Sequence, residues 1–238
     1  MKLRVATHNV CHMGFNYLDA TQAFPDGKYR FGYEADRVEP MRKRWQEVYA
    51  GFSADLIGIQ EYFYWVDLAH EFVTKDDVYG RFGYEVADGD KGLAIATRFP
   101  LEPVYETDFE PVSKRRRQKF YLNLDGNRIA LFNAHPTPRD NAPIRAEEYA
   151  VLIEEYRKEP YFIAFGDYNA RVSAEYQPFR DAGFPMVNTG FGTERKGLHC
   201  DNIILSPNIR VTKTELFDRE CTLSDHAVLY AELEIDQA

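Results

Sequence analysis

The chain has 238 residues, of which 45% are hydrophobic and 28% charged, a balance typical of a globular protein with a full core. These values exclude the disordered, collagen-like and low-complexity classes. With 29 Lys and Arg against 38 Asp and Glu, the formal charge is −9, which makes long duplex nucleic acid a less natural partner without excluding it.

The cysteines and the N-terminal sequence predict a cytoplasmic, reduced protein. Cys11, Cys200 and Cys221 are far apart and odd in number, which argues against a disulfide framework and against a zinc site. No apolar signal-peptide segment begins the chain, and no apolar run reaches the roughly 18 residues that a membrane span needs. We therefore expect a cytoplasmic location and no membrane span.

Hydrophobic periodicity predicts many strands and few helices. Apolar residues at spacings of three and four predict helices over 37–52, 68–73 and 142–156. Alternating or continuous apolar runs predict strands over 3–9, 55–60, 92–97, 104–109, 119–124, 128–133, 161–165, 202–205, 209–217 and 227–235. The sequence Asp125-Gly126-Asn127 predicts a tight hairpin between two of them.

The scarcity of helices indicates the fold class. A parallel sheet needs a crossover helix at nearly every connection, so two mostly antiparallel sheets, packed together with helices on their outer faces, fit this α/β (α+β) pattern better. No linker-like stretch or internal repeat occurs, and we expect a single domain over residues 1–238.

A long polar segment over 13–35 carries six aromatic residues. A loop of this length without regular structure is usually functional or disordered, and the aromatic residues argue against disorder. Two interpretations stay open: a loop pinned to the surface by its aromatic side chains, or a lid that faces the substrate.

Polar side chains stand at the ends of six predicted strands. Each one alone is typical of a turn or a cap, but strand ends on a rigid core also position catalytic groups. The candidate site residues are Asn9, Glu61, His135, Asp167, Asn169, Asp201, Asp225 and His226.

Their chemistry is coherent. Glu61 and Asp225, with the amide oxygen of Asn9, are hard oxygen ligands that suit Mg²⁺ or Mn²⁺. His226 beside a carboxylate such as Asp201 is an oriented imidazole. A metal, an imidazole and an acid together suit the attack of water on a phosphate ester.

Six short blocks carry a resemblance to a known family. They resemble, in order and over residues 7–226, the signature blocks of the endonuclease/exonuclease/phosphatase family, the deoxyribonuclease I-like metal-dependent phosphoesterases. The blocks are Thr7-His8-Asn9-Val10, Ile59-Gln60-Glu61, Asn133-Ala134-His135, Gly166-Asp167-Tyr168-Asn169, Asp201-Asn202-Ile203-Ile204 and Leu223-Ser224-Asp225-His226.

The resemblance implies a four-layer α/β/β/α sandwich and a metal site. Glu61 resembles the principal Mg²⁺ ligand of the family, with Asn9 and Asp225 near or in the shell of the metal. A Mg²⁺ or Mn²⁺ cofactor is therefore expected.

The resemblance also implies catalytic roles. Asp201 resembles the carboxylate that orients a histidine, here His226, and His135 resembles a second histidine that faces the phosphate. Asp167 and Asn169 resemble the pair that handles the attacking water or leaving group. Either Asp167 or His226 accepts the proton of the water; we favour His226, with Asp167 assisting.

Three departures bear on the branch of the family. The abasic-site endonuclease branch typically has Asp where this chain has Cys11, Tyr in place of His135, and a Trp shortly before Asp201 that is absent here. These differences argue against a role in DNA repair. A histidine at position 135 is similar to the deoxyribonuclease I-like, sphingomyelinase and inositol-phosphatase branches.

The basic run Lys114-Arg115-Arg116-Arg117 has two interpretations. It can be a solvated guard of an edge strand against aggregation, or a second anion site for another phosphate or a nucleic-acid backbone.

The function expected is a Mg²⁺-dependent phosphodiesterase or phosphatase, with a small molecule or a lipid headgroup favoured as the substrate. A nuclease acting on DNA or RNA is the first alternative. A catalytically silent binding or regulatory homologue is the second, against which the complete set of site residues argues.

Overall fold

The computed structural model describes residues 1–11, 35–62, 78–88 and 92–236. Within them the chain forms a six-stranded sheet in the order β10-β11-β1-β2-β4-β3 and a five-stranded sheet in the order β5-β6-β7-β8-β9. The predicted helix over 68–73, and the aromatic side chains predicted as a loop or lid, lie outside the described residues.

The elements have the following bounds. The strands of the first sheet are β1 (Lys2–Asn9), β2 (Leu56–Tyr62), β3 (Glu85–Asp88), β4 (Gly92–Thr97), β10 (Ile209–Phe217) and β11 (Val228–Ile235). Those of the second are β5 (Leu101–Phe109), β6 (Ser113–Leu124), β7 (Asn127–His135), β8 (Phe162–Asp167) and β9 (Asp201–Leu205). The helices are α1 (Ala35–Gly51), α3 (Ala142–Tyr156) and α4 (Gln177–Asp181), with short 3-10 turns at Gly80–Phe82, Arg139–Asn141 and Ser173–Tyr176.

Two of the strand pairs are parallel. β1 pairs in parallel with β2 and β7 with β8, and the other pairs in both sheets are antiparallel. The two parallel connections run through α1 and α3, the crossovers that such pairs require. The predicted pair of mostly antiparallel sheets is confirmed.

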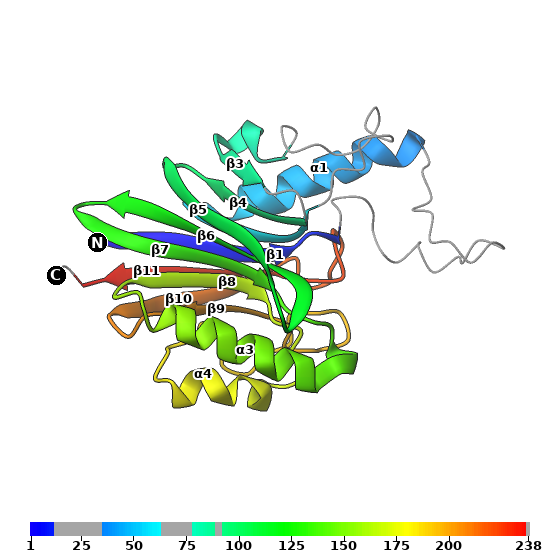
Figure 1. Cartoon of the computed structure of the whole chain (residues 1–238). Helices are drawn as coiled ribbons and strands as arrows, with labels where there is room; N and C mark the ends of the chain where they lie inside the picture. The colour runs from blue at the N-terminus through cyan, green and yellow to red at the C-terminus, as the bar shows by residue number, and fades with distance from the viewer. Residues whose placement is uncertain (12–34, 63–77, 89–91, 237–238) are drawn as a thin grey trace.

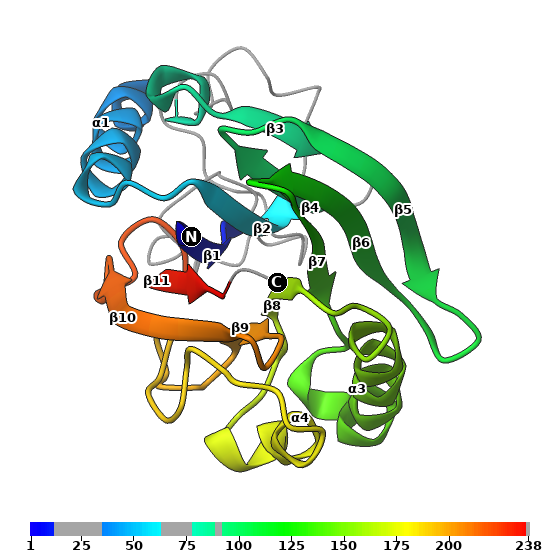
Figure 2. The ribbon, with the colours of Figure 1, turned by 90° about the vertical axis from the view of Figure 1, so that its left-hand side faces the viewer.

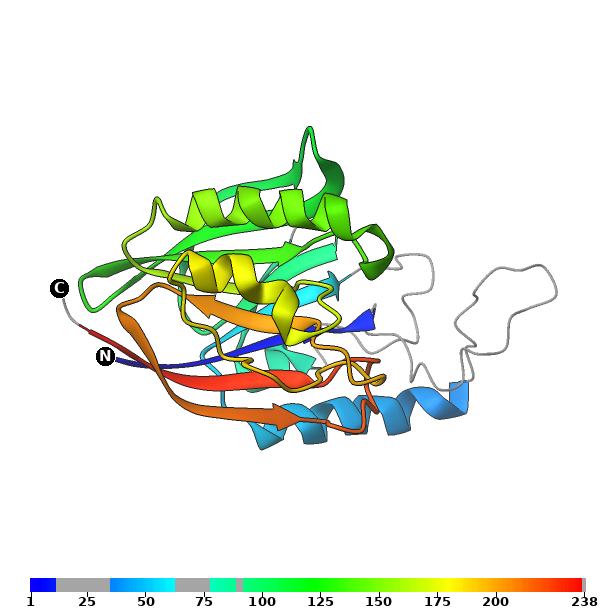
Figure 3. The ribbon, with the colours of Figure 1, turned by 90° about the horizontal axis from the view of Figure 1, so that it is seen from below.

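The sheets and helices form four layers (Figures 2 and 3). Trp45, Tyr49 and Phe52 of α1 pack on the outer face of the first sheet. Tyr149 and Tyr156 of α3, with α4 beside them, cover the outer face of the second sheet. A core of aliphatic side chains from both sheets fills the space between them. Among the described residues, we find no helix with the length and apolar character that crossing a membrane requires.

Local sequence signals predicted most of these elements. The bounds of β4, β10 and α3 agree with the predicted ranges, and Asp125 and Gly126 take φ of 50° and 82°, as a tight hairpin with two left-handed residues requires. The periodicity missed β3 and α4, which have four and five residues and are too short for a repeat to show.

The two sheets approach closely in the centre of the sandwich. A Cβ atom on Gly58 of β2 would lie 2.2 Å from Cβ of Phe165 of β8. Gly58 is therefore required for this approach, because only a residue without a side chain leaves room for the phenyl ring of the facing sheet.

The basic run 114–117 does not lie on an edge strand. It belongs to β6, which is paired on both sides, with β5 and β7, so the interpretation as an edge guard is wrong. On the outer face, Arg117 forms an ion pair with Glu155 of α3, and Arg115 donates from Nε to the carbonyl oxygen of His135 at 3.1 Å. These contacts fasten β6 to its neighbours.

The strand ends that carry the candidate residues meet at one end of the sandwich. β1 and β2 run parallel and end there, as β7 and β8 do in the second sheet. Both chain termini lie at the opposite end (Figure 1).

Candidate active site

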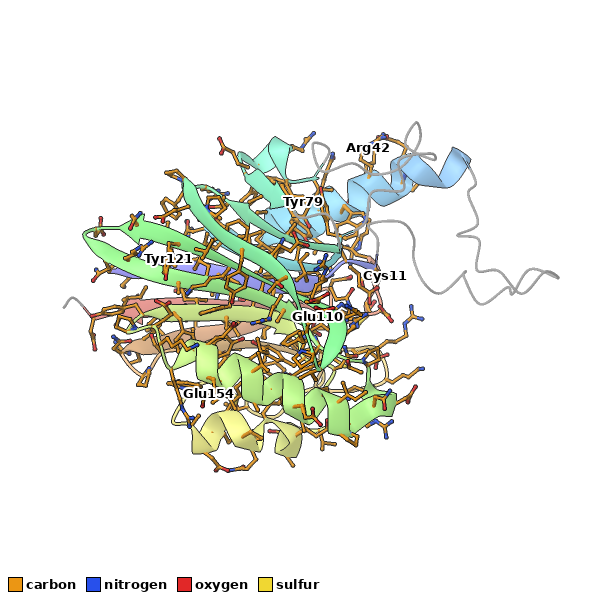
Figure 4. All side chains as sticks on the ribbon, viewed as in Figure 1. Cys11, Arg42, Tyr79, Glu110, Tyr121 and Glu154 are labelled. Carbon is orange, nitrogen blue, oxygen red and sulfur yellow. The ribbon has the colours of Figure 1, made fainter. Side chains whose placement is uncertain are left out.

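Asn9 links the two sheets at the end of β1. Its side-chain Nδ2 donates to Oδ2 of Asp167 at 2.9 Å, across the gap between the sheets. Its Oδ1 accepts from the backbone N–H of Cys11 at 3.0 Å, which holds Cys11 at a φ of 41°. Figure 4 labels Cys11, which marks the end of the sandwich where the site lies.

Glu61 is held in an unusual backbone conformation near the end of β2. Its φ is 54°, and the pairing with β4 shifts register between Gln60 and Tyr62, so that Glu61 is the extra residue of a bulge. Positive φ is costly for a residue with a side chain and is often found at functional sites. The bulge brings Glu61 Oε1 to 3.8 Å from His135 Nε2 and leaves 29% of the side chain exposed.

The second sheet and the segment after β8 contribute a buried carboxylate, an imidazole and an amide. His135, at the end of β7, has its Nε2 3.4 Å from Oδ2 of Asp167, at the end of β8. Asn169 takes a φ of 55° and donates its backbone N–H to Oδ1 of Asp167 at 2.8 Å. Its side-chain Nδ2 donates to the carbonyl oxygen of Pro136 at 3.0 Å. These bonds hold the β7 and β8 ends together.

His226 is bound to a fully buried carboxylate. Its Nδ1 is 2.7 Å from Oδ2 of Asp201, the first residue of β9, and Asp201 donates its backbone N–H to Thr193 Oγ1 at 2.9 Å. The other nitrogen, Nε2, lies 3.8 Å from Oδ2 of Asp167 and 3.8 Å from Oδ1 of Asp225. The imidazole thus points into the same space as Asn9 and His135.

Ser224, which had no predicted role, connects the end of β1 to the segment that carries His226. Its hydroxyl donates to the carbonyl oxygen of Asn9 at 2.6 Å and accepts the backbone N–H of His226 at 3.2 Å. The serine therefore places the segment that carries Asp225 and His226 against the end of β1. Its only sequence signal was its place immediately before Asp225.

The cluster shifts the pKa values of Asp167 and His226 in opposite directions. Burial opposes ionisation of Asp167, but the imidazoles of His226 and His135 and the N–H donors of Asn9 and Asn169 lower the pKa of Asp167 below its ordinary value. Burial likewise opposes protonation of His226, but the nearby carboxylates raise its pKa well above the ordinary value.

The electrostatics around Glu61 suit a cation. Burial first, and then the charge of Asp167, raise the pKa of Glu61, with Asp225 adding to the effect; the hydrogen bond of Asn9 and the imidazole of His226 oppose it. Three carboxylates therefore repel one another at this point, and a divalent cation would relieve that repulsion. Oxygen donors of this kind match Mg²⁺ and Mn²⁺.

Another part of the cluster, apart from Glu61, has metal-ligand spacing within the described residues. Atoms of Asp167, Asp201 and His226 all lie within 4.8 Å of one another, and all three residues are buried. His226 Nδ1 and Asp201 Oδ2 already bind each other at 2.7 Å. A cation there would have to break that hydrogen bond, whereas the carboxylate of Glu61 is partly exposed and is repelled by its neighbours, which makes it the better fit for a metal.

Arg116 lies beside the candidate site, opposite His135. The sequence pointed to the basic run 114–117 but did not single out this residue. It stands directly opposite His135 in the β6–β7 register, so that both side chains project from the same face of the sheet. Its side chain is 18% exposed, and Nη1 lies 4.0 Å from Oδ2 of Asp108, beyond hydrogen-bond distance. The basic run 114–117 was the signal that could have found it.

Helix α3 fastens the segment that follows His135. Glu148, fully buried, accepts from the backbone N–H of Thr137 at 2.6 Å, from its hydroxyl at 2.7 Å, and from the hydroxyl of Ser113. Pro136, between His135 and Thr137, is the residue whose carbonyl oxygen binds Asn169. One buried carboxylate therefore supports two candidate site residues from behind.

Glu148→Ala should lower the free energy of unfolding by about 2–3 kcal/mol, because three donors lose a charged acceptor in a buried place. Urea unfolding at neutral pH measures the loss. Glu154→Ala on the same helix is the control: its side chain is 65% exposed, and we expect a change of less than about 0.5 kcal/mol. Equal losses in the two variants would contradict this role of Glu148.

His8 is a buried histidine that links β1, α1 and the site. Its Nε2 lies 3.3 Å from the carbonyl oxygen of His226 and its Nδ1 2.8 Å from the hydroxyl of Tyr49. A carbonyl only accepts, so the proton is on Nε2 and the Tyr49 hydroxyl donates to Nδ1. Burial lowers the pKa of His8 from 6.5 to about 4.

His8 should make the protein sensitive to acid. Because its folded-state pKa is lower than the unfolded value, its contribution to stability is complete above the unfolded pKa and is lost as the pH falls toward the folded pKa of about 4. Between pH 7.5 and pH 5 the wild type should lose about 2 kcal/mol more than His8→Gln, in which no group titrates at this position. Urea unfolding of both proteins at the two pH values tests this, and parallel losses would show that His8 is protonated in the folded state.

The described structure thus brings all eight candidate residues to one end of the sandwich. Asn9 and Glu61 come from the first sheet; His135, Asp167 and Asn169 come from the second. This four-layer sandwich, with carboxylates and imidazoles gathered at one end of both sheets, defines the class of deoxyribonuclease I-like α/β folds.

The sequence comparison assigns the family. The chain belongs to the Endonuclease/Exonuclease/phosphatase family, whose sequence profile matches residues 6–226. Members of this family are hydrolases that act on phosphoester bonds. No curated protein matches the sequence at a significant level.

Solved structures with the same fold share little sequence with this chain. An endonuclease/exonuclease/phosphatase protein from Beutenbergia cavernae superposes with a TM-score of 0.69 at 13% identity, covering 100% of this chain and 72% of that one. D. rerio TDP2 complexed with a single-strand DNA product gives 0.68 at 15% identity, with coverages of 98% and 99%. The human Nocturnin catalytic domain with a bound sulfate anion gives 0.68 at 16%, with coverages of 99% and 95%. At these identities the likeness shows the fold alone.

Proposed function

We propose that the protein is a divalent-metal-dependent hydrolase of phosphate esters. The observation that carries the proposal is the hydrogen-bonded pair Asp201–His226 beside Asp167, with the partly exposed carboxylate of Glu61 nearby. This arrangement offers a proton donor, an ionised acceptor and a place for a cation within one end of the sandwich. Together they suit the attack of water on a phosphate ester at neutral pH.

In this proposal Glu61 is the principal ligand of Mg²⁺ or Mn²⁺, with Asn9 and Asp225 beside it. When bound, the cation withdraws negative charge from the phosphoryl oxygens. Asn9 has a second role that does not need the cation, because its Nδ2 holds Oδ2 of Asp167 in place at 2.9 Å.

Donors from both sheets would bind the phosphate. His226 and His135 face the space between the sheet ends and donate to oxygens that gain charge in the transition state. The amide of Asn169 keeps one hydrogen on the carbonyl oxygen of Pro136 and has a second one to donate. Arg116, opposite His135 in register, offers a guanidinium to the same anion.

The geometry supports Asp167, and not His226, as the acceptor of the proton from water. Nδ1 of His226 is bound to Asp201, and its Nε2 faces the carboxylates of Asp167 and Asp225, a setting in which both nitrogens carry protons. Asp167 is ionised and is held by the N–H donors of Asn9 and Asn169. This assignment reverses the preference drawn from the sequence.

For the substrate we propose a small phosphorylated molecule or a lipid headgroup, in keeping with the charge of −9. A nuclease acting on DNA or RNA is the second candidate, favoured by the likeness to the fold of D. rerio TDP2, which was solved with single-strand DNA product. A nuclease would lose activity steeply as salt rises, because phosphate-backbone contacts release counterions. A silent homologue would show no turnover at all.

A substrate screen tests the proposal. Phosphomonoesters, phosphodiesters, single- and double-stranded DNA, and RNA are incubated with Mg²⁺ or Mn²⁺, with Glu61→Ala as the blank. Turnover of at least one ester that needs the metal and vanishes in the blank is expected. Turnover that survives chelation, or that the blank retains, would overturn the proposal.

A further inference from the structure

The candidate site is divided between the two sheets. The proposed metal ligands Asn9, Glu61 and Asp225 all belong to strands of the first sheet or to the turn that enters β11. His135 and Asp167 end strands of the second sheet. His226 follows Asp225 and stays with the first sheet. The distance between a bound cation and His135 or Asp167, the second-sheet groups that handle phosphate and water, therefore depends on how the two sheets sit against each other.

Most of the contact between the sheets is apolar. The shared core consists of aliphatic and phenyl side chains such as Leu56, Leu131 and Phe165. Apolar burial is non-directional, so in this core the relative position of the sheets depends on shape alone, as where Phe165 packs against Gly58; hydrogen bonds add a directional constraint. Catalytic groups, by contrast, must be held within a fraction of an ångström.

One layer beneath the site, a polar bridge crosses this apolar core. Its members, Thr7 of β1, Gln60 of β2 and Asn133 of β7, are fully buried. Nε2 of Gln60 donates to Oδ1 of Asn133 at 2.7 Å, and the hydroxyl of Thr7 lies 3.3 Å from Oε1 of Gln60. The bridge therefore joins both central strands of the first sheet to the second sheet.

The bridge has one possible orientation. Nδ2 of Asn133 donates to the carbonyl oxygens of Ile59 at 2.9 Å and Ala94 at 2.8 Å, which can only accept. Oδ1 of Asn133 is thereby left as an acceptor, so Gln60 must present its NH₂ group to it; the same Nε2 also donates to the hydroxyl oxygen of Thr7 at 3.1 Å. Each bond fixes the next, and a sliding of one sheet past the other would break all of them.

The bridge lies immediately beside both halves of the site. Gln60 directly precedes Glu61, and Asn133 stands two residues before His135, on the same face of β7. Resting on the proposed function, we propose that Gln60 and Asn133 are positioning residues, whose buried amide pair fixes the metal-binding half of the site against the half that handles water and phosphate.

The contacts within the site itself are less suited to this task. Asn9 meets Asp167 and His226 meets Asp201 across the sheets, but these groups take part in binding and proton transfer. Their charges and partners change during turnover. The amides of Gln60 and Asn133 do not ionise and are out of reach of a substrate, so the bridge they form persists.

The test uses Gln60→Met, Asn133→Leu and the double variant, each close in size to the original side chain. The control is Ser206→Ala, at the opposite end of the second sheet. Ser206 is also fully buried; it accepts the backbone N–H of Phe162 at 3.1 Å and donates to Oδ1 of Asn208 at 2.7 Å. It therefore matches the bridge in burial and hydrogen bonding without lying near the site.

Four quantities are measured on each protein: kcat and KM on the ester found in the screen, the Mn²⁺ dissociation constant by calorimetry, and the thermal midpoint. The bridge variants should lose about 10–10²-fold in kcat, the loss expected from a displacement near 1 Å. The Mn²⁺ dissociation constant should stay close to wild type, because all the proposed metal ligands belong to one sheet. The double variant should lose no more than the worse single variant, since both act through one bond. Ser206→Ala should lower the thermal midpoint and keep kcat.

Several results would overturn the inference. A wild-type kcat in a folded bridge variant shows that the site needs no bridge. Mn²⁺ affinity that falls in step with kcat shows that the amides support only the first sheet, and an equal kcat loss in Ser206→Ala shows a general effect of destabilisation. Gln60→Met leaves both amide hydrogens of Asn133 bonded, so it carries the test if Asn133→Leu does not fold. A wild-type chain that hydrolyses no ester overturns the proposed function, and this inference with it.

Discussion

Glu61→Ala should lower kcat by about 10²–10⁴-fold or more, because the variant loses the proposed principal ligand for a cation that would neutralise the phosphoryl oxygens. The bulge at Glu61, its positive φ and its partly exposed carboxylate all place this residue where a cation would sit. Steady-state kinetics with saturating Mn²⁺ measure the loss.

The same variant should remain folded. Burial and two neighbouring carboxylates raise the pKa of Glu61, which means that folding disfavours its ionised form at neutral pH. Without metal, the thermal midpoint of Glu61→Ala should therefore equal or exceed that of the wild type. Adding Mn²⁺ should raise the midpoint of the wild type alone, since a ligand stabilises only a protein that binds it.

Glu102→Ala is the matched control. Glu102 lies on β5, pairs with Tyr121 of β6 far from the site, and has a side chain that is 53% exposed. This variant should keep the kcat of the wild type and its stabilisation by Mn²⁺. A Glu61→Ala protein that is as active as the control would remove the metal site from the proposal.

Asp167→Asn should lower kcat by about 10²–10⁴-fold and abolish the rise of activity with pH in the acid range. A general base works only when deprotonated, and the pKa of Asp167 is lowered, so this rise belongs below the ordinary range of an aspartate. Asparagine keeps the shape of the side chain and removes its basicity. The measurement is a pH–rate profile of kcat.

Asp201→Asn serves as the comparison. It removes the partner of His226 without touching Asp167, so kcat should fall while the rise with pH persists. If His226 were the base, the result would be reversed: Asp167→Asn would retain the rise, and Asp201→Asn would shift or lose it. The two profiles together therefore discriminate between the two assignments.

Much of the fold could be predicted from local patterns. The helices over 142–156 and near 37–52 follow from apolar residues at spacings of three and four, and these helices bury those faces on the two sheets. The hairpin at Asp125 and Gly126 follows from residues that accept positive φ. Strand order does not follow in this way, because pairing joins residues that are far apart in the chain.

The candidate site, too, could be predicted only in part from the sequence. Its eight side chains were visible because polar residues interrupted apolar strands at their ends. The supporting residues were harder to find: Arg116 was visible only as part of the basic run, Ser224 only by its place before Asp225, and Glu148 gave no signal that separates it from other helix residues. Their importance comes from what lies opposite them, which only the pairing of β6 with β7 and the packing of α3 reveal.

The sequence by itself determined the types of chemical group, their order along the chain and the elements that carry them, because periodicity and strand-end residues are local properties. The tertiary structure alone decided which groups touch. Asp167 meets Asn9 and His226, and Gln60 meets Asn133, only because two sheets pack at a fixed register. Charge and hydrogen bonding act over a few ångströms, so the separation of an ionised Asp167 from a protonated His226 exists only after that packing is complete.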